Sequence, residues 1–142
     1  MKLVLVTGGF DPLHSGHIDY FREAKKLGDK LVVGVNSDDW LTRKKGRPFM
    51  PFKERCAIIE NLSMVDQVIE VMNDDKFDDA GGAIFKLLST NSNKTHIIFA
   101  NGGDRNQGNV PEEATYGDYP NVSFVYGVGG KTKKNSSSWI LK

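Results

Sequence analysis

With 142 residues, of which 39% are hydrophobic and 26% charged, the chain has the size and composition of one soluble globular domain. Its formal net charge of +1 gives no reason to expect a nucleic acid or a membrane surface as partner. A single cysteine, Cys56, excludes an internal disulfide, and no apolar run approaches the roughly 20 residues needed to span a bilayer, so we expect a cytoplasmic protein.

Residues 3–35 have the pattern of one β-α-β unit. The apolar run from Leu3 to Val6 is typical of a strand buried on both faces of a parallel sheet. Residues 16–27 have helical periodicity, and Gly28 follows where a left-handed C-cap belongs. A second apolar strand covers 31–35, and the connection between the strands is long enough for a right-handed crossover.

The rest of the chain repeats this alternation less clearly. We expect a helix over 52–62, with its inward face formed by Ala57, Ile58, Ile59 and Leu62. A strand at 67–71, a helix around 83–88, strands at 95–100 and 122–126, and a short helix from Ser136 complete the pattern. Residues 101–120 are polar and glycine-rich, which is typical of a functional surface loop. The sequence therefore predicts a Rossmann-like, doubly wound α/β fold with about five mostly parallel strands, whose ligands bind at the strands' carboxyl ends.

The segment from Thr7 to His17 carries the chemistry, and it lies between a predicted strand and a predicted helix. Its three glycines let backbone N–H groups approach a ligand, and the helix start attracts phosphate. His14 and His17 are spaced i, i+3, so both lie on one side of the first helical turn and can donate hydrogen bonds to phosphoryl oxygens. The candidate nucleotide-binding residues here are Thr7, Gly8, Gly9, Phe10 and Gly16.

Other interpretations of this segment are open but less favoured. The glycines alone could form only a turn. Two histidines could bind zinc, but no third ligand of suitable type stands nearby. The Gly-Lys-Ser/Thr of a Walker loop and the Gly-x-Gly-x-x-Gly of a dinucleotide site are both absent.

His14-Ser15-Gly16-His17, after Gly9-Phe10-Asp11, resembles the H-x-G-H motif of the cytidylyltransferase-like nucleotidyltransferases. Further motifs are similar to those of heptose-phosphate adenylyltransferases: Asn36-Ser37-Asp38, Arg47-Pro48 with Pro51, Glu54-Arg55, Val65-Asp66 and Gly102-Gly103-Asp104. Lys44, Arg55 and the stretch from Lys131-Thr132 to Ser136-Ser137 also resemble glycerol-3-phosphate cytidylyltransferase, although Lys134 and Asn135 depart from its pattern. The resemblance runs through most of the chain.

The resemblance implies transfer of AMP or CMP from a nucleoside triphosphate to a small phosphorylated acceptor by direct in-line attack, with release of pyrophosphate. The acceptor would be a sugar or polyol phosphate such as heptose-1-phosphate or glycerol-3-phosphate. His14 and His17 would act on the triphosphate, and Lys44 would draw the α-phosphate and the acceptor phosphate together. Arg55 would contact a phosphate or, alternatively, pair with Glu54 or an aspartate.

The remaining implied roles concern the ends of the substrates. Asp11 would contact hydroxyls of the acceptor or the ribose, and Asp104 the nucleotide sugar or a metal-bound water. Ser136 and Ser137 would hold the β- and γ-phosphates or serve as ordinary helix caps. Mg²⁺ is expected with the triphosphate, with no protein residue assigned as its ligand.

Several residues, and the function of the whole chain, have more than one interpretation. The basic run 43–47, which contains Lys44, is either a mobile anion clamp or a solvated loop. Trp40 could stack on a base or pack, His96 is expected to be structural, and Cys56 to be a core thiol. The chain could also be a non-catalytic triphosphate sensor or an adapter that binds through 101–120, but retention of His14, His17 and Lys44 favours an enzyme. A homodimer is a further expectation.

Overall fold

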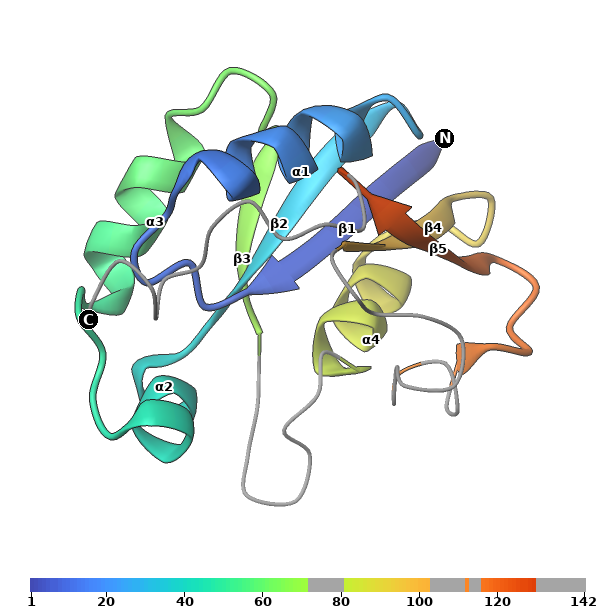
Figure 1. Ribbon diagram of the computed structural model, residues 1–142. Coiled ribbons are helices and arrows are strands. Elements are labelled where there is room, and N and C mark those ends of the chain that lie inside the picture. The colour runs from blue at the N-terminus through green and yellow to red at the C-terminus, as the bar shows by residue number, and fades with distance from the viewer. Residues whose placement is uncertain (72–80, 103–111, 113–115, 130–142) are drawn as a thin grey trace.

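The computed structural model describes residues 1–71, 81–102, 112 and 116–129. Five parallel strands form one sheet in the order β3-β2-β1-β4-β5 (Figure 1). The strands are β1 (Lys2–Gly8), β2 (Lys30–Asn36), β3 (Gln67–Val71), β4 (His96–Gly102) and β5 (Val122–Val128). This confirms the predicted Rossmann-like α/β class, and every paired strand is parallel.

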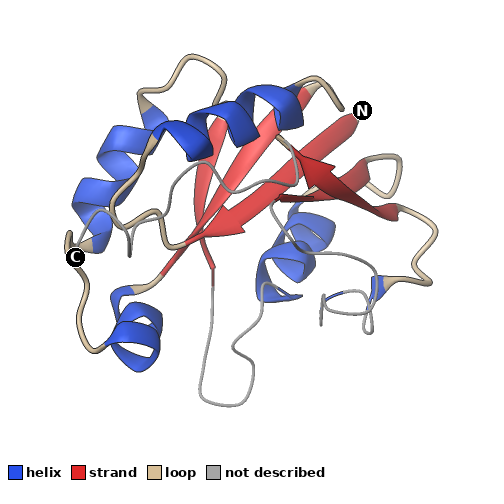
Figure 2. Ribbon diagram, viewed as in Figure 1, coloured by secondary structure: helices blue, strands red, loops and turns tan. Residues whose placement is uncertain are grey.

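The described helices lie on both faces of the sheet and beyond its carboxyl edge (Figure 2). They are α1 (Ser15–Lys25), α2 (Asp38–Lys45), α3 (Phe52–Glu60) and α4 (Gly81–Thr90). Helices α1 and α3 cover one face, and α4 covers the other (Figure 1). Among the described residues, no helix is both long and apolar enough to cross a membrane.

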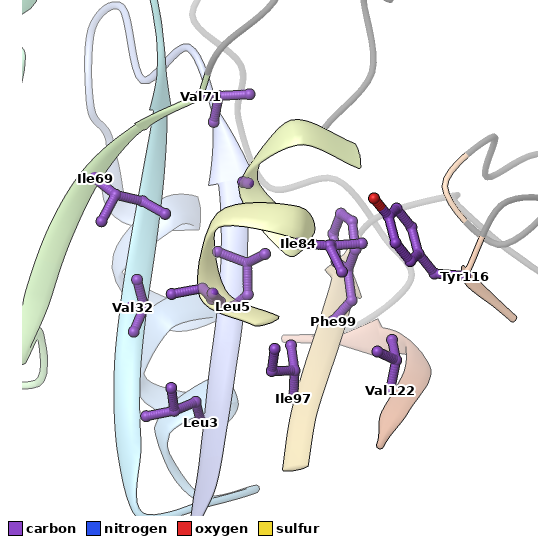
Figure 3. Close-up of a cluster of buried hydrophobic side chains, with 12 residues drawn as sticks. Leu3, Leu5, Val32, Ile69, Val71, Ile84, Ile97, Phe99, Tyr116 and Val122 are labelled. Atoms are coloured by element: carbon purple, nitrogen blue, oxygen red, sulfur yellow. The ribbon is translucent and has the colours of Figure 1, made fainter. Parts of the chain in front are cut away.

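Alternation along the strands builds two cores. On β1, Leu3 and Leu5 face the α4 side, where they belong to one core cluster with Ile84 and Phe99 (Figure 3). The residues between them, such as Val4, belong to the core under α1 and α3. Both sets are buried, which confirms the interpretation of this run as a strand covered on both faces.

The predicted left-handed cap at Gly28 is wrong. Helix α1 is capped by Lys26 in right-handed helical conformation, and Gly28 does not have a positive φ. A Cβ at Gly28 would come within 2.9 Å of the Lys2 carbonyl oxygen, so the glycine is needed for close packing of the loop against β1. The next residue continues this contact, because Asp29 N donates to the same oxygen at 2.8 Å.

The predicted inward face of the third helix is wrong in part. Ile59 is buried, but Ala57 is exposed and Ile58 is 41% exposed. The buried partner of Ile59 is Arg55, four residues earlier on the same face, and Leu62 packs against the core after the helix has ended. Periodicity in apolar residues missed this face because an arginine occupies half of it.

Three residues noted in the sequence make structural contacts, and two of them, His96 and Asp66, lie near the amino ends of the strands. His96 Nε2 lies 2.5 Å from Ser123 Oγ and links the first residues of β4 to β5. Asp66 accepts from Lys25 Nζ and, at 2.8 Å, from Leu31 N, and these two bonds lower the pKa of its carboxyl. Cys56 packs against the core under α3, and burial raises the pKa of its thiol.

Candidate active site

The strands part at the carboxyl edge of the sheet. Strand β1 pairs with β4 as far as Leu5 and Phe99, but with β2 as far as Gly8 and Val35. Along the chain, β2 and β3 are added on one side of β1, and β4 and β5 are then added on its other side. The β1–β4 boundary is therefore the topological switch point, where open α/β sheets bind their ligands.

His14 and His17 stand at the start of α1, directly beyond the end of β1. His14 is the N-cap, and its Nδ1 accepts from Gly16 N at 3.1 Å. His17 Nδ1 accepts from His14 N at 3.1 Å, which completes a capping box. The two rings stack with centroids 3.8 Å apart. Two imidazoles thus take the part that Ser and Glu side chains usually have at a helix start.

This capping fixes which ring nitrogens carry protons. Because both Nδ1 atoms accept backbone N–H groups, each neutral ring has its proton on Nε2. Burial and the neighbouring His14 lower the pKa of His17 to about 3, so this ring is neutral at physiological pH. The His17 ring is therefore a neutral Nε2–H donor beside the partial positive charge of the helix start, and the His14 ring is stacked on it.

The glycines of the segment are required by side chains of the protein. A Cβ at Gly16 would lie 3.0 Å from His14 Cε1, and a Cβ at Gly8 would lie 2.9 Å from the ring of Phe10. Phe10 has a positive φ of 51°, is buried, and meets the ring of His17 edge-on at 4.9 Å. These residues hold the histidine pair in place, while Thr7 is half-buried at the end of β1.

Asp11 anchors the protein's own backbone. Its Oδ2 accepts from Phe49 N at 2.5 Å and its Oδ1 from Met50 N at 2.6 Å. The side chain is 1% exposed. The buried carboxylate therefore holds segment 49–50 against the glycine segment, and its contact with acceptor or ribose hydroxyls stays a prediction.

Arg55 joins the glycine segment, the end of β2 and the start of α2. Of the two partners predicted for it as an alternative to a phosphate, Glu54 or an aspartate, the structure shows an aspartate. Arg55 NH2 lies 2.6 Å from Asp38 Oδ1, and the arginine side chain is 0% exposed. The other bonds run to backbone carbonyl oxygens of Gly9, Asn36 and Met50, at 2.7 to 3.0 Å. With these donors directed at the protein, Arg55 holds the glycine segment against β2 and α2, and its phosphate contact stays a prediction.

Lys44 lies on a helix that the sequence analysis missed. Ser37 caps α2 by accepting from Trp40 N at 3.1 Å, and Asp38 and Asp39 occupy its first turn. This N-cap serine followed by two acidic residues was the available signal. Lys44 is exposed, with Nζ 5.7 Å from the centroid of the Trp40 ring.

Helix α2 packs directly on the glycine segment. A Cβ at Gly9 would lie 2.9 Å from Leu41 Cδ2 and 3.6 Å from the Trp40 ring. The Trp40 ring therefore lies close to both Gly9 and Lys44, and its contact with Gly9 gives it a packing role. Lys44 is thus carried on a helix that touches the phosphate-binding candidate segment, and only Gly46 and Arg47 of the predicted loop 43–47 lie beyond that helix.

Other predicted site residues are not placed. Asp104, Ser136 and Ser137 lie outside the described residues, as does most of the predicted loop 101–120. Within the described part of the chain, no group of three or more His, Cys, Asp or Glu side chains could hold a metal ion. Asn101, which is 1% exposed at the end of β4, was not among the predicted site residues. A polar residue directly after a buried apolar strand was the signal.

The strand order and the histidine pair together mark the switch point as the candidate active site. Residues 5–105 match the family described as Cytidylyltransferase-like, and the chain belongs to this family. The family resemblance inferred from the sequence is therefore confirmed.

Two curated relatives share the name Bifunctional protein HldE. That of Haemophilus influenzae (strain PittGG) is 38% identical over 112 residues, which are 72% of this chain and 24% of the relative. That of Pasteurella multocida (strain Pm70) is 45% identical over 75 residues, 51% of this chain and 16% of the relative. The chain thus spans less than a third of the length of these relatives.

Solved structures share the fold. The lipopolysaccharide core biosynthesis protein from Thermoplasma volcanium GSS1 superposes with a TM-score of 0.71 at 28% identity, covering 94% of this chain and 99% of that one. A bifunctional NMN adenylyltransferase/ADP ribose pyrophosphatase from Francisella tularensis has a TM-score of 0.61 at 15% identity, covering 97% of this chain and 39% of that one. The second likeness concerns the fold alone.

Proposed function

We propose that the protein transfers AMP from ATP to the phosphate of a small sugar phosphate, with heptose-1-phosphate as the first acceptor to test, and releases pyrophosphate. One observation carries the proposal: two stacked histidines cap α1 through Nδ1 and thereby present Nε2–H donors at the switch point. Similarity to the HldE proteins supports ATP over CTP, which is the alternative base, as do the heptose-enzyme motifs.

The histidines stabilise charge on the triphosphate during transfer. The acceptor phosphate is already ionised, so it attacks the α-phosphorus without a general base. Catalysis then depends on holding two anions close together and stabilising the charge that develops. The His17 ring suits this task as a neutral donor, because it stays uncharged at physiological pH.

Lys44 supplies the mobile positive charge. Its ammonium group is exposed and borne on α2, which packs on Gly9 through Trp40 and Leu41. A long flexible cation suits a contact that forms only when both phosphates are bound. Arg55 and Asp11 keep α2 and segment 49–50 against the glycine segment, so we assign them positioning roles in the same reaction.

Mg²⁺ and the remaining candidates complete the proposal. Mg²⁺ would arrive with the triphosphate and keep most of its waters, because this ion usually takes few protein ligands. Such an ion would neutralise charge on the phosphates. Asp104, Ser136 and Ser137 stay candidates for the nucleotide, and a cytoplasmic location and a homodimer belong to the proposal as well.

Pyrophosphate release tests the proposal. Each of the four nucleoside triphosphates is combined with Mg²⁺ and with heptose-1-phosphate, glycerol-3-phosphate or phosphocholine. We expect release with ATP and heptose-1-phosphate. His14→Ser is the matched variant, because a serine preserves an N-cap but is too short to reach a phosphate. Its kcat should fall by about 10²–10³, the usual loss when one transition-state donor is removed.

Two results would contradict the proposal. Triphosphate binding without pyrophosphate release from any pair would favour the sensor interpretation. Release that is unaffected in His14→Ser would remove the histidine pair from the reaction, provided that circular dichroism shows the variant folded.

A further inference from the structure

Asn101 has a buried acceptor without a partner. Its Nδ2 donates to the carbonyl oxygens of Phe99 and Val125, both at 3.4 Å. Its Oδ1 has no hydrogen-bond partner, and no other buried side-chain polar atom in the described part of the chain shares this state. Nearly all buried polar groups in proteins are paired, so an orphan at the carboxyl edge of a sheet points to a group that arrives with a ligand.

The backbone fixes the orientation of this amide. Rotating it by 180° would place Oδ1 against two carbonyl oxygens, so Nδ2 must face them. Because Val125 lies on β5, Nδ2 is directed toward β5 and Oδ1 of the same planar group is turned away from it. Asn101 therefore presents an acceptor and no free donor on that side.

Asn101 lies at the switch point, on the face opposite to the histidines. It follows Phe99 by two residues, as Thr7 follows Leu5, and Leu5 and Phe99 form the last β1–β4 pair. Leu5 and Phe99 both face α4. The β-bulge between β4 and β5 beside Ala100 places its extra residue on β5, so side chains along β4 still alternate between the two faces of the sheet. Thr7 and Asn101 are thus on the α4 side where the two strands part.

This position fits the acceptor substrate. In-line transfer places the leaving pyrophosphate and the attacking group on opposite sides of the α-phosphorus. The histidines at α1 would hold the triphosphate from one face, which leaves the α4 side to the acceptor. We propose that Asn101 Oδ1 accepts a hydrogen bond from a hydroxyl group of the acceptor and so contributes to its selection.

The chemistry of the amide oxygen of Asn101 indicates which part of the acceptor it contacts. An amide oxygen repels phosphate oxygens and binds neutral donors, so Asn101 contacts the sugar or polyol part of the acceptor and leaves its phosphate to cations such as Lys44. A substrate that lacks the hydroxyl leaves Oδ1 unpaired and is disfavoured. The inference rests on the proposed function and adds a residue that selects hydroxylated acceptors.

The test compares acceptors within one enzyme. The value of kcat/KM is measured for heptose-1-phosphate and for each of its monodeoxy analogues, in wild type, in Asn101→Ser and in Asn93→Ser. Asn93 is an exposed asparagine in the turn before β4 and serves as the control. The ratio between two acceptors does not depend on the fraction of folded enzyme, so a partly destabilised variant still gives an answer.

We expect wild type and Asn93→Ser to disfavour one deoxy analogue by roughly tenfold or more. In Asn101→Ser this ratio should fall to about one, with a higher KM for heptose-1-phosphate and an unchanged KM for ATP. An unchanged ratio, or an effect on the KM of ATP alone, would overturn the role of Asn101 while leaving the transferase activity intact. Absence of transfer by wild type to any acceptor of the panel would refute the proposed function and this role together.

Discussion

Replacing Arg55 by methionine would remove the cation that joins the glycine segment to β2 and α2. The side chain is 0% exposed, and its four hydrogen bonds end on three carbonyl oxygens and on Asp38. The Asn36 carbonyl lies in a fully buried contact and would lose its donor at a cost of about 1–3 kcal/mol. The contacts to Gly9 and Met50 are part-buried, so water recovers some of their loss.

The expected total is about 3 kcal/mol, the low end for breaking a buried ion pair, because the Asp38 side chain is 42% exposed and regains water. For a chain of this size that corresponds to a fall of about 10 °C in Tm. Thermal unfolding followed by circular dichroism measures it. Lys53→Met is the matched control, since it removes an exposed cation from the same helix and should change stability by less than about 0.5 kcal/mol.

The same pair of variants separates a positioning role from a substrate contact. A destabilised Arg55→Met with a loss of transfer fits the geometry described here. A Tm equal to that of Lys53→Met, together with loss of transfer, would refute this reasoning and restore the phosphate contact that the family resemblance implied.

Two further variants test the histidine pair. Gly16→Ala should lower the free energy of unfolding by about 1 kcal/mol and reduce transfer, because the new Cβ would lie 3.0 Å from the His14 ring and displace the helix cap. A Gly16→Ala variant that is more stable than wild type and keeps its turnover would contradict this reasoning. His17 titrates near pH 3 in the native state and near 6.5 when unfolded, so the unfolded chain binds the extra proton between these values. Stability should therefore decline as pH falls from 6.5 toward 3, by at most about 1.4 kcal/mol per pH unit from this group. Urea titrations of wild type and His17→Asn should show a flatter dependence in the variant, and parallel curves would contradict the lowered pKa.

Apolar patterning predicted the sheet well because its strands are buried on both faces. The run at Leu3–Val6 and the strand 67–71 are examples, and the latter matches β3 residue for residue. The H-x-G-H motif was equally informative, since its spacing corresponds to a structural unit: a capping histidine, a glycine that leaves room for its ring, and a second capping histidine.

Long-range polar contacts were beyond the sequence pattern. Arg55 was placed on the inward face of α3 by carbonyls from residues 9, 36 and 50, which no periodicity reveals. Asp11 was assigned to a substrate because a carboxylate beside a phosphate segment suggests one, but backbone donors from 49 and 50 occupy both of its oxygens. Helix α2 was missed because its basic residues resemble a solvated loop more than an amphipathic helix.

The most direct test of the central claim is the fate of labelled phosphate. ATP labelled at either the α- or the γ-phosphorus is incubated with the protein, Mg²⁺ and heptose-1-phosphate, and the label in the sugar product is counted. A nucleotidyltransferase transfers the α-label and leaves the γ-label in pyrophosphate, which is the result we predict. Transfer of the γ-label to the sugar, or label in the product from neither position, would contradict the account.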